Sequence, residues 1–377
     1  MKTKYIGLDV HKDTVAVAIA DGDNREVRSY GQIPHTVEGV SKVARKLSSD
    51  GVQLHFAYEA GCCGFGTYRL LTGLGHRCDV IAPSMTPRRP GERIKTDRRD
   101  ALAIARLLRA GELTPVWVPD EAHEAMRDLV RTRHDAVCSL RRARQQLGGF
   151  LLRHGRVYTA TEKRWGTVHK RWIRNQKFEY EAQGLVLEDY FHAIEQAETR
   201  IAEITSRIHE AMPDWPLAPL VDRLQAMRGI SVISAVVLVA ELGDFERFAR
   251  PAQLMAYVGL VPSETSSGTH RRLGGITKSG NEAVRRTLVE SAWNYRMPAR
   301  ISKNMMEHQK RLPREVREIA WKAQVRLHQR YKAMLARGKR PTIAVTAIAR
   351  EMVGFLWVQI PAIAISHSDM MARSVPR

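Results

Sequence analysis

Hydrophobic and polar residues alternate in short runs through about the first 115 residues of the chain. Such runs, rich in β-branched residues, predict strands, whereas apolar residues three or four positions apart predict helices. The order is three strands, a helix, a strand, a helix, a strand and a helix. The strands are predicted at 4–10, 14–20, 26–32, 54–60 and 78–82, and the helices at 37–47, 68–74 and 96–110. This pattern predicts an α/β domain that starts with an antiparallel meander.

A different pattern begins near residue 119. Apolar residues keep a spacing of three or four through 121–158 and 185–212, which predicts two long helices that pair as an antiparallel, coiled-coil arm. The segment between them, 159–184, is basic and contains tryptophans. It fits the tip of the arm or a nucleic-acid contact, and equally well a solvated connector with buried tryptophans.

Prolines within 213–219 separate the arm from a second helical region. Residues 220–293 are predicted to be mainly helical, and 224–231 resembles a helix–hairpin–helix turn that holds phosphate, or a turn that only packs two helices. Further on, 298–340 is a basic helical stretch and 341–357 an apolar helix. The predicted parts are an α/β domain, the arm with its basic insert, a helical domain and a basic helical extension, at 1–118, 119–215, 216–300 and 301–377.

The balance of charge points to a partner. The 377 residues include 60 Lys and Arg against 40 Asp and Glu, which gives a formal charge of +20. This excess is not needed for folding and favours a polyanionic partner such as nucleic acid. With 44% hydrophobic and 27% charged residues, the chain can bury ordinary cores, which argues against global disorder.

The sequence predicts neither export nor a membrane span. The first residues lack the long apolar region of a signal peptide. The most apolar stretches, 230–242 and 352–365, fall short of the ~18–20 residues that a span needs. The cysteines contain no CxxC pair, which argues against a zinc site or a disulfide framework and fits a reducing cytoplasm. They are Cys62, Cys63, Cys78 and Cys138.

Four carboxylates are placed where they can meet. Asp9 ends the first predicted strand and Glu59 ends the fourth. The order of elements is that of a ribonuclease-H-like fold, in which these two strands are neighbours. Asp97 and Asp100 are three residues apart at the start of a predicted helix, with Thr96 as its N-cap, so they share one face. We therefore expect the four side chains at one edge of the sheet.

Convergent carboxylates repel one another, and hard divalent cations with oxygen ligands keep them ionised together. Two Mg²⁺ ions ~4 Å apart would clamp the attacking and leaving oxygens of a phosphodiester. Plainer interpretations stay open: a strand-end Asp is often a cap or an ion-pair partner, and Asp97 and Asp100 could pair with Arg93 and Arg98. Asp13 is a further candidate ligand, which we interpret as a turn residue.

The densest polar segment is 263–281, which mixes hydroxyls, glycines and cations. Its glycines let the backbone approach a ligand closely, and Arg271, Arg272 and Lys278 can neutralise phosphate. This composition predicts a phosphate-binding loop, in which a serine could attack phosphorus if a base or metal activated it. His270 could carry a proton, although a surface histidine is the plainer interpretation.

Three sequence blocks, in a fixed order over about residues 5–290, resemble a known family. They are Gly7-Leu8-Asp9-Val10-His11-Lys12; Tyr58-Glu59-Ala60-Gly61 with Lys95-Thr96-Asp97-Arg98-Arg99-Asp100-Ala101; and Gly259-Leu260-Val261-Pro262 through Ser267-Gly268 to Gly274-Gly275-Ile276-Thr277-Lys278-Ser279-Gly280-Asn281. The chain resembles the DEDD-type insertion-sequence transposases of the one-hundred-and-ten family, grouped as bridge-RNA-guided recombinases. The resemblance implies a RuvC-like N-terminal domain, a coiled-coil arm and a helical transposase domain. It places a metal-binding acidic tetrad on Asp9, Glu59, Asp97 and Asp100.

The resemblance also implies a nucleophilic serine directly before a glycine. That residue is Ser267, before Gly268; Ser266 adjoins it, and Ser263 is a more distant candidate. Family members are expected to work as oligomers, dimers or tetramers, in which the serine of one subunit meets the acidic site of another. They are also expected to bind a non-coding RNA that pairs with donor and target DNA, in the nucleoid of a prokaryotic cytoplasm.

We therefore predict a Mg²⁺-dependent, site-specific DNA recombinase that moves an insertion sequence through a serine–DNA ester. Basic residues near the tetrad are expected to hold the nucleic-acid backbone: Arg88, Arg89, Arg93, Lys95, Arg98 and Arg99. One alternative is a structure-specific nuclease of the Holliday-junction-resolvase type, which uses the same tetrad with metal-activated water. Another is a non-catalytic RNA- or DNA-binding protein.

Overall fold

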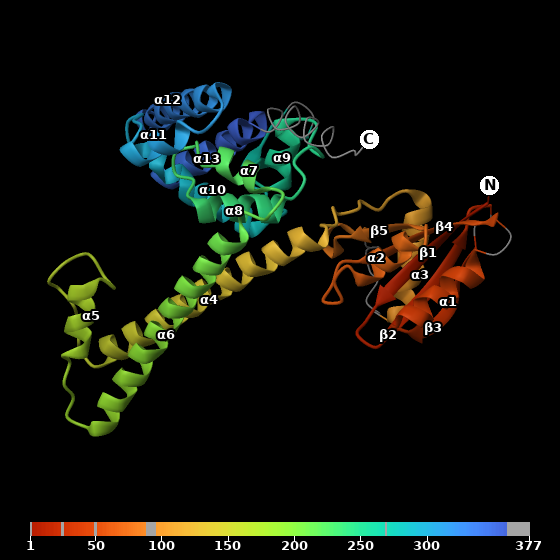
Figure 1. Ribbon diagram of the computed structural model, residues 1–377, viewed down its shortest axis with the longest axis horizontal. Helices are drawn as coiled ribbons and strands as arrows, with labels where there is room; N and C mark the ends of the chain where they lie inside the picture. Colours follow the sequence, from red (N-terminus) through yellow and green to blue (C-terminus); the bar gives the residue numbers. More distant parts are fainter. Residues whose placement is uncertain (1, 24–25, 49–50, 88–95, 268–269, 360–377) are drawn as a thin grey trace, which may run out of the picture. The chain divides into compact units, whose positions relative to one another are not determined.

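The computed structural model describes residues 2–23, 26–48, 51–87, 96–267 and 270–359 (Figure 1). The chain divides into two compact units, Met1–Val118 and Pro119–Arg377, which we call unit 1 and unit 2. Unit 1 is a mixed α/β body, and the described part of unit 2 is mainly helical.

Within its described residues, unit 1 is built on a five-stranded sheet with strand order β3-β2-β1-β4-β5. The strand β1 pairs antiparallel with β2 and parallel with β4, and β3 and β5 extend the sheet in the same senses. The strands are β1 (Thr3–Val10), β2 (Thr14–Asp21), β3 (Val27–Pro34), β4 (Gln53–Glu59) and β5 (Arg77–Ile81). The five predicted strands are confirmed, and the first and fourth are neighbours as expected.

The two faces of this sheet carry different side chains, because successive residues of a strand point to opposite faces. Large apolar residues cover the face that packs on α1 (Val37–Leu47) and α2 (Gly66–Gly73): Ile6, Leu8, Phe56 and Tyr58. Small residues cover the face that packs on α3 (Asp97–Ala110): Gly7, Ala16, Ala18 and Ala57. A short 3-10 turn, η2 (Pro83–Met85), follows β5.

Helix α3 crosses β1 at Gly7 with no side chain between the two backbones. A Cβ atom at residue 7 would lie 2.2 Å from the carbonyl oxygen of Ala101 and 2.4 Å from the amide nitrogen of Ala105. Both alanines are buried against the small residues of β2. The segment of α3 around Ala101–Ala105, directly after its first turn, is therefore held against the sheet by backbone contact.

Gly7→Ala tests this contact. The added methyl group meets backbone atoms that cannot rotate away, so we expect the free energy of unfolding of unit 1 to fall by about 1–3 kcal/mol. Amide hydrogen exchange in α3 should also become faster. The matched control is Gly73→Ala, because a Cβ there meets nothing within 4 Å; we expect a change within about 0.5 kcal/mol. Equal urea midpoints for the two variants would contradict the close approach of α3 to β1.

Unit 2 begins with an arm of two long helices, α4 (Glu121–Arg153) and α6 (Glu181–Ala211), which lie side by side (Figure 1). They run antiparallel: Arg133 Nε donates to Thr205 Oγ1 at 2.8 Å, and Arg144 Nη2 donates to Glu198 Oε1 at 2.9 Å. The prediction that the first helix continues to residue 158 was wrong, since α4 ends at Arg153.

The segment 159–184 forms the far end of this arm (Figure 1). It contains a helix that the hydrophobic pattern did not predict, α5 (Thr167–Arg174). Its buried Ile173 packs on Leu147 of α4 and Ile194 of α6 in a core cluster of the arm's own. The tryptophans at 165 and 172 are half-buried beside that cluster.

The rest of unit 2 is a helical body with one hydrophobic core. Its helices are α7 (Ala218–Leu224), α8 (Val232–Leu242), α9 (Pro251–Tyr257), α10 (Glu282–Ala292), η3 (Trp293–Arg296), α11 (Lys303–Gln309), α12 (Arg314–Ala336) and α13 (Pro341–Val358). The region 220–293 also contains a hairpin that was not predicted, β6 (Pro262–Glu264) with β7 (Leu273–Ile276). These strands are short and largely exposed, so they lack an apolar alternation.

The turn between α7 and α8 is occupied by contacts within the body. Arg228 Nη1 donates to the carbonyl of Pro298 at 2.6 Å, and Gln309 Nε2 donates to the carbonyl of Ala226 at 3.0 Å. Met227 between them is fully buried. These contacts favour the packing interpretation of this turn.

Among the described residues, α13 is the one helix whose length and apolar composition would suffice to cross a membrane. This helix confirms the apolar helix predicted at 341–357 and is one residue longer, with 18 residues. Ala344, Ile348 and Met352 are fully buried in the core of the helical body. That burial is typical of a core helix.

Candidate active site

Two of the four predicted carboxylates end neighbouring strands. The parallel pairing of β1 with β4 joins Gly7 to Ala57 and Leu8 to Tyr58, so the next residues along, Asp9 and Glu59, follow in the same register. Since side chains alternate along a strand, Asp9 shares the face of Gly7, and Glu59 shares the face of Ala57. Both carboxylates are half-buried on the side of the sheet that α3 covers.

The other two carboxylates stand in the first turn of α3. The Thr96 hydroxyl accepts from the amide of Arg99 at 3.3 Å, which confirms it as the N-cap. Asp97 is exposed and Asp100 is half-buried. Negative charge is favourable at this end of a helix, because the free amides carry partial positive charge. The contact at Gly7 directs this end of the helix toward Asp9.

His11 joins the two groups. Its Nε2 lies 3.3 Å from Asp9 Oδ2 and 3.5 Å from Asp97 Oδ1. One potential ligand atom from each of the three residues lies within 4.8 Å of the others. His11 was not among the predicted site residues, although its place two residues after a strand-end carboxylate was the available signal.

The carboxylates influence one another electrostatically. Burial raises the pKa of the Asp9 carboxyl above its ordinary value, His11 lowers it, and Asp100 and Asp97 raise it, with a net increase. Asp100 and Asp97 are therefore close enough to Asp9 to repel its charge. A divalent cation would relieve this repulsion, and the donors at hand, carboxylate oxygens with one imidazole nitrogen, suit such an ion.

Part of the predicted basic surface falls in the described structure. Arg98 and Arg99 are exposed in the first turn of α3, beside Asp97 and Asp100. The remaining predicted contacts lie outside the described residues: Arg88, Arg89, Arg93 and Lys95.

The predicted nucleophile lies in the hairpin of unit 2. The amide of Ser267 donates to the carbonyl of His270, and the amide of His270 donates to the carbonyl of Ser267, each at 3.1 Å. Residues paired in this way place their side chains on the same face of a hairpin. Ser267 and His270 are both exposed, and the following Gly268 lies outside the described residues. No described residue hydrogen-bonds the Ser267 hydroxyl.

The neighbouring serine is engaged. The Ser266 hydroxyl donates to Glu264 Oε1 at 2.8 Å, and Arg271 donates to both oxygens of Glu264 at 3.0 and 3.3 Å. The bond from Ser266, and then Arg271, hold the pKa of the Glu264 carboxyl below its ordinary value. Arg271 therefore has a carboxylate partner, whereas Arg272 and Lys278 are simply exposed.

The polar segment 263–281, which we call the serine segment, is joined to the helical body by close backbone contacts. The amide of Lys278 donates to the carbonyl of Gly259 at 3.1 Å. A Cβ atom at Gly280, whose φ is +72°, would lie 1.7 Å from the carbonyl oxygen of Tyr257. Asn281 then caps α10, since its Oδ1 accepts from the amide of Val284 at 3.0 Å. The glycine at 280 is thus required by packing, whatever it does for a ligand.

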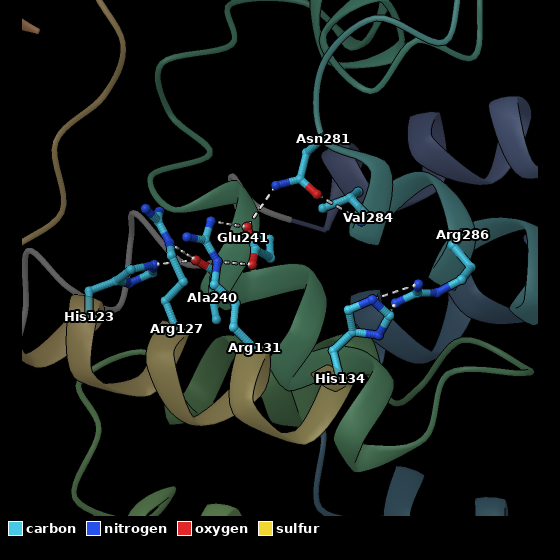
Figure 2. Close-up of polar contacts among 9 residues, drawn as sticks. All are labelled: His123, Arg127, Arg131, His134, Ala240, Glu241, Asn281, Val284 and Arg286. Atoms are coloured by element: carbon cyan, nitrogen blue, oxygen red, sulfur yellow. Dashed lines mark hydrogen bonds and ion pairs between the residues drawn. The ribbon is translucent and has the colours of Figure 1, made fainter. Parts of the chain in front are cut away.

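An ion pair between a buried carboxylate and a partly exposed arginine lies next to the end of this segment (Figure 2). Glu241 of α8 is 5% exposed and receives Arg131 of α4 at both oxygens, at 2.8 and 3.0 Å. Asn281 Nδ2 donates to Glu241 Oε2 at 2.7 Å, which ties the serine segment to the arm. Burial alone would raise the pKa of the Glu241 carboxyl, but Arg131 and Asn281 outweigh it, so the pKa lies below its ordinary value.

Further contacts in Figure 2 join the same three helices. Arg127 Nε and His123 Nε2 of α4 approach the carbonyl of Ala240 at 2.9 and 2.8 Å. The guanidinium of Arg286 on α10 lies 3.1 and 3.2 Å from the ring nitrogens of His134 on α4. None of these contacts between helices was predicted from the sequence, because the partners are more than 100 residues apart in the chain.

Glu241→Gln is expected to lower the free energy of unfolding by about 1–3 kcal/mol at pH 7, because Arg131 loses a buried counter-charge. A carboxyl whose pKa is lowered by folding adds stability above its unfolded pKa and loses it as the pH falls. The gap between the wild type and the variant should therefore shrink below about pH 4. Chemical unfolding at pH 7, 5 and 3 measures it. The control is Glu290→Gln, at a side chain that is 70% exposed. A stability gap as large at pH 3 as at pH 7 would contradict an ionic origin.

Known proteins resemble the chain over both parts of this arrangement. Residues 6–155, which include the acidic site, match a family model described as a transposase, and residues 221–310, which include the serine segment, match the model of the transposase IS116/IS110/IS902 family. A transposase-type protein of Sinorhizobium fredii, y4qE, is 48% identical over 354 residues, which are 94% of this chain and 87% of the relative. The transposase for insertion sequence element IS1533 of Leptospira borgpetersenii is 32% identical over 347 residues, which are 90% of this chain and 99% of the relative.

Proposed function

The chain belongs to the IS116/IS110/IS902 family of insertion-sequence transposases, and from that premise we propose that it cuts and rejoins DNA through a serine–DNA ester, with Mg²⁺ at its acidic site and an RNA as guide. The observation that carries the catalytic part is the meeting of Asp9 and Asp97 beside His11 at the sheet edge. The strand order of the sheet supports a RuvC-like catalytic domain at 1–118.

The residues that would hold Mg²⁺ are Asp9, Glu59, Asp97 and Asp100. When bound there, the ion would polarise the scissile phosphate and lower the pKa of the attacking hydroxyl. Protein side chains do the remaining work. Arg98 and Arg99, with Arg88, Arg89, Arg93 and Lys95, would hold the DNA or RNA backbone near the carboxylates.

In the first chemical step, Oγ of Ser267 attacks phosphorus. The Oγ–P bond forms and the bond from phosphorus to the leaving deoxyribose oxygen breaks. The serine proton passes to a base, which returns it to the leaving oxygen. His270, whose backbone pairs with that of Ser267, would take that proton, a role supported by its place on the same face of the hairpin. Arg272 and Lys278, and Arg271 once released from Glu264, would stabilise the charge on phosphate.

The ester conserves the energy of the phosphodiester bond, so another strand can be joined without ATP. A hydroxyl of the incoming strand attacks the same phosphorus, and serine leaves with its proton restored. Following the resemblance, we propose that the chain acts as a homo-oligomer, in which the serine of one subunit serves the carboxylates of another. A non-coding RNA would select the DNA by pairing, and the charge of +20 suits a protein that holds several strands.

A suicide DNA substrate, nicked so that the released strand diffuses away, tests the proposal. The serine mechanism predicts a protein–DNA conjugate that survives denaturation. A nuclease that uses metal-activated water would cut the same DNA and leave no conjugate. Cutting without any conjugate would therefore overturn the serine step and leave the acidic site in place.

A further inference from the structure

The tip of the arm has a surface that the recombination chemistry does not use. Between Arg153 and Lys177 the chain has eight lysines and arginines and a single carboxylate, that of Glu162. Most of these cations are exposed. Two carboxylates of α6 reach this tip and take part of the charge, since Glu198 pairs with Lys170 and Glu195 pairs with Arg174.

Aromatic rings lie directly among these cations. A cavity of about 310 Å³ at the tip is lined by Trp165, Trp172, Tyr158 and His169, with Arg156 and Arg164 also on its wall. The rings of His169 and Trp172 are nearly parallel, with centroids 5.8 Å apart and an angle of 10° between planes. A second cavity, of about 360 Å³, has Trp165 on its wall with Arg141 and Arg144 of α4. The Trp165 indole therefore borders open space in two directions.

The backbone of Trp165 is in a conformation that a tryptophan rarely adopts. Its φ is +68°, in the left-handed region that favours glycine. Its amide donates to Nδ1 of His169 at 2.9 Å, and burial, then Arg164, lower the pKa of that histidine, which keeps the ring neutral as an acceptor. The guanidinium of Arg144 lies 5.1 Å from the centre of the indole ring. Non-glycine residues held in this region concentrate at functional sites, where the fold accepts the cost in order to present a side chain.

Aromatic rings that line a cavity among cations match one kind of partner. Unpaired bases stack on aromatic rings, and the phosphates between them pair with lysines and arginines. A duplex keeps its bases stacked inside and would use only the cations. The same cationic tip of a second copy of this chain would be repelled from this tip.

We propose that the tip of the arm binds single-stranded nucleic acid, with an unpaired base in the cavity lined by Trp165 and Trp172 and neighbouring phosphates on Arg156, Arg164 and Arg171. This site is separate from the acidic site and the serine segment, and it needs no metal ion. RNA and DNA offer the same stacking chemistry, so the two are distinguished by experiment.

Binding is measured on the full chain carrying Asp9→Asn, in EDTA, so that no cutting occurs. The probes are fluorescent ten-residue strands of oligo-U and oligo-dT and a hairpin duplex, followed by anisotropy. Trp165→Gly removes the ring while relaxing the backbone, and should weaken single-strand binding about tenfold or more. Trp165→Phe keeps an aromatic face and should remain within about threefold. Trp165→Gly should weaken duplex binding much less than single-strand binding, and Trp165→Phe should leave duplex binding close to that of the parent protein.

The double variant Arg164→Glu/Arg171→Glu should also weaken single-strand binding and reduce its dependence on salt. Its matched control is Arg317→Glu with Lys322→Glu, two exposed cations of α12. Because these side chains are exposed, the charge variants test the proposal even if Trp165→Gly disturbs the arm, which circular dichroism would reveal.

Unchanged single-strand affinity in both the Trp165→Gly and the charge variants would overturn the proposal. Unchanged affinity together with an altered molecular mass in solution would assign the tip to contacts between subunits, which also overturns it. The assay contains no strand cleavage, so a failure here leaves the serine mechanism intact, and a failure of that mechanism leaves this site intact.

Discussion

Asp9→Asn is expected to lower the rate of DNA strand cleavage by at least about a thousandfold, the scale on which removal of a charge-stabilising group acts at a reacting phosphate. The variant should also bind Mn²⁺ more weakly in calorimetry. Burial and the neighbouring carboxylates raise the pKa of Asp9, so its charge destabilises the metal-free fold and asparagine should not lower the melting temperature. Lost cleavage could then not be attributed to unfolding.

The matched control for this variant is Asp13→Asn. Asp13 is an exposed residue of the turn after β1, only four positions from Asp9, and its carboxyl lies outside the group formed by Asp9, His11 and Asp97. We expect the cleavage rate of Asp13→Asn to stay within about threefold of the wild-type rate. EDTA should abolish cleavage by the wild type and by Asp13→Asn. Cleavage by Asp9→Asn within tenfold of the wild type would exclude a metal site built on this residue.

Ser267→Ala is expected to abolish the protein–DNA conjugate and to lower strand exchange by roughly 10⁴-fold or more, as loss of a nucleophile does in other covalent mechanisms. The hairpin should persist, because Ser267 pairs with His270 through backbone groups that alanine retains. DNA binding by the variant, measured separately, should remain close to that of the wild type.

Ser266→Ala is the neighbouring control. It removes the hydroxyl that donates to Glu264, while Arg271 still pairs with that carboxylate. We expect the conjugate to form at a rate within about tenfold of the wild type. A conjugate that forms with Ser267→Ala but not with Ser266→Ala would identify Ser266 as the nucleophile. A conjugate that still forms when both serines are replaced by alanine would remove both from the mechanism.

The approach of Asp97 to Asp9 at the candidate acidic site could be predicted from the sequence, because each carboxylate is placed by a local pattern and the order of elements brings those patterns together. Asp9 and Glu59 each end an apolar strand, and the order of elements makes those strands neighbours. Asp97 and Asp100 share the first turn of a helix whose cap, Thr96, is visible in the sequence. Alternation places Asp9 and Glu59 on one face of the sheet, and helical spacing places Asp97 and Asp100 in the first turn of the helix that covers that face.

The parts that could not be predicted depend on distant partners. Glu241 ends an apolar helix, and nothing near it in the sequence indicates that Arg131, 110 residues earlier, neutralises it. The hairpin that carries Ser267 is made of short, exposed strands, so no hydrophobic period marks it. Helix α5 forms because Ile173 finds a core on two other helices, which the sequence of the insert does not show.

Helix α4 is fixed to the helical body at Arg131, so a small rotation there would produce a larger displacement at the tip of the arm. From Arg131 to Arg153 the helix rises ~33 Å at 1.5 Å per residue, and α6 stiffens it along that length. A rotation of about 10° at the anchor would carry the tip sideways by about 6 Å, close to two base-pair steps of a duplex. Asn281 and Arg131 both bind Glu241, so the serine segment is joined to the same anchor. A small tilt of the hairpin would therefore accompany a larger displacement of the tip of the arm.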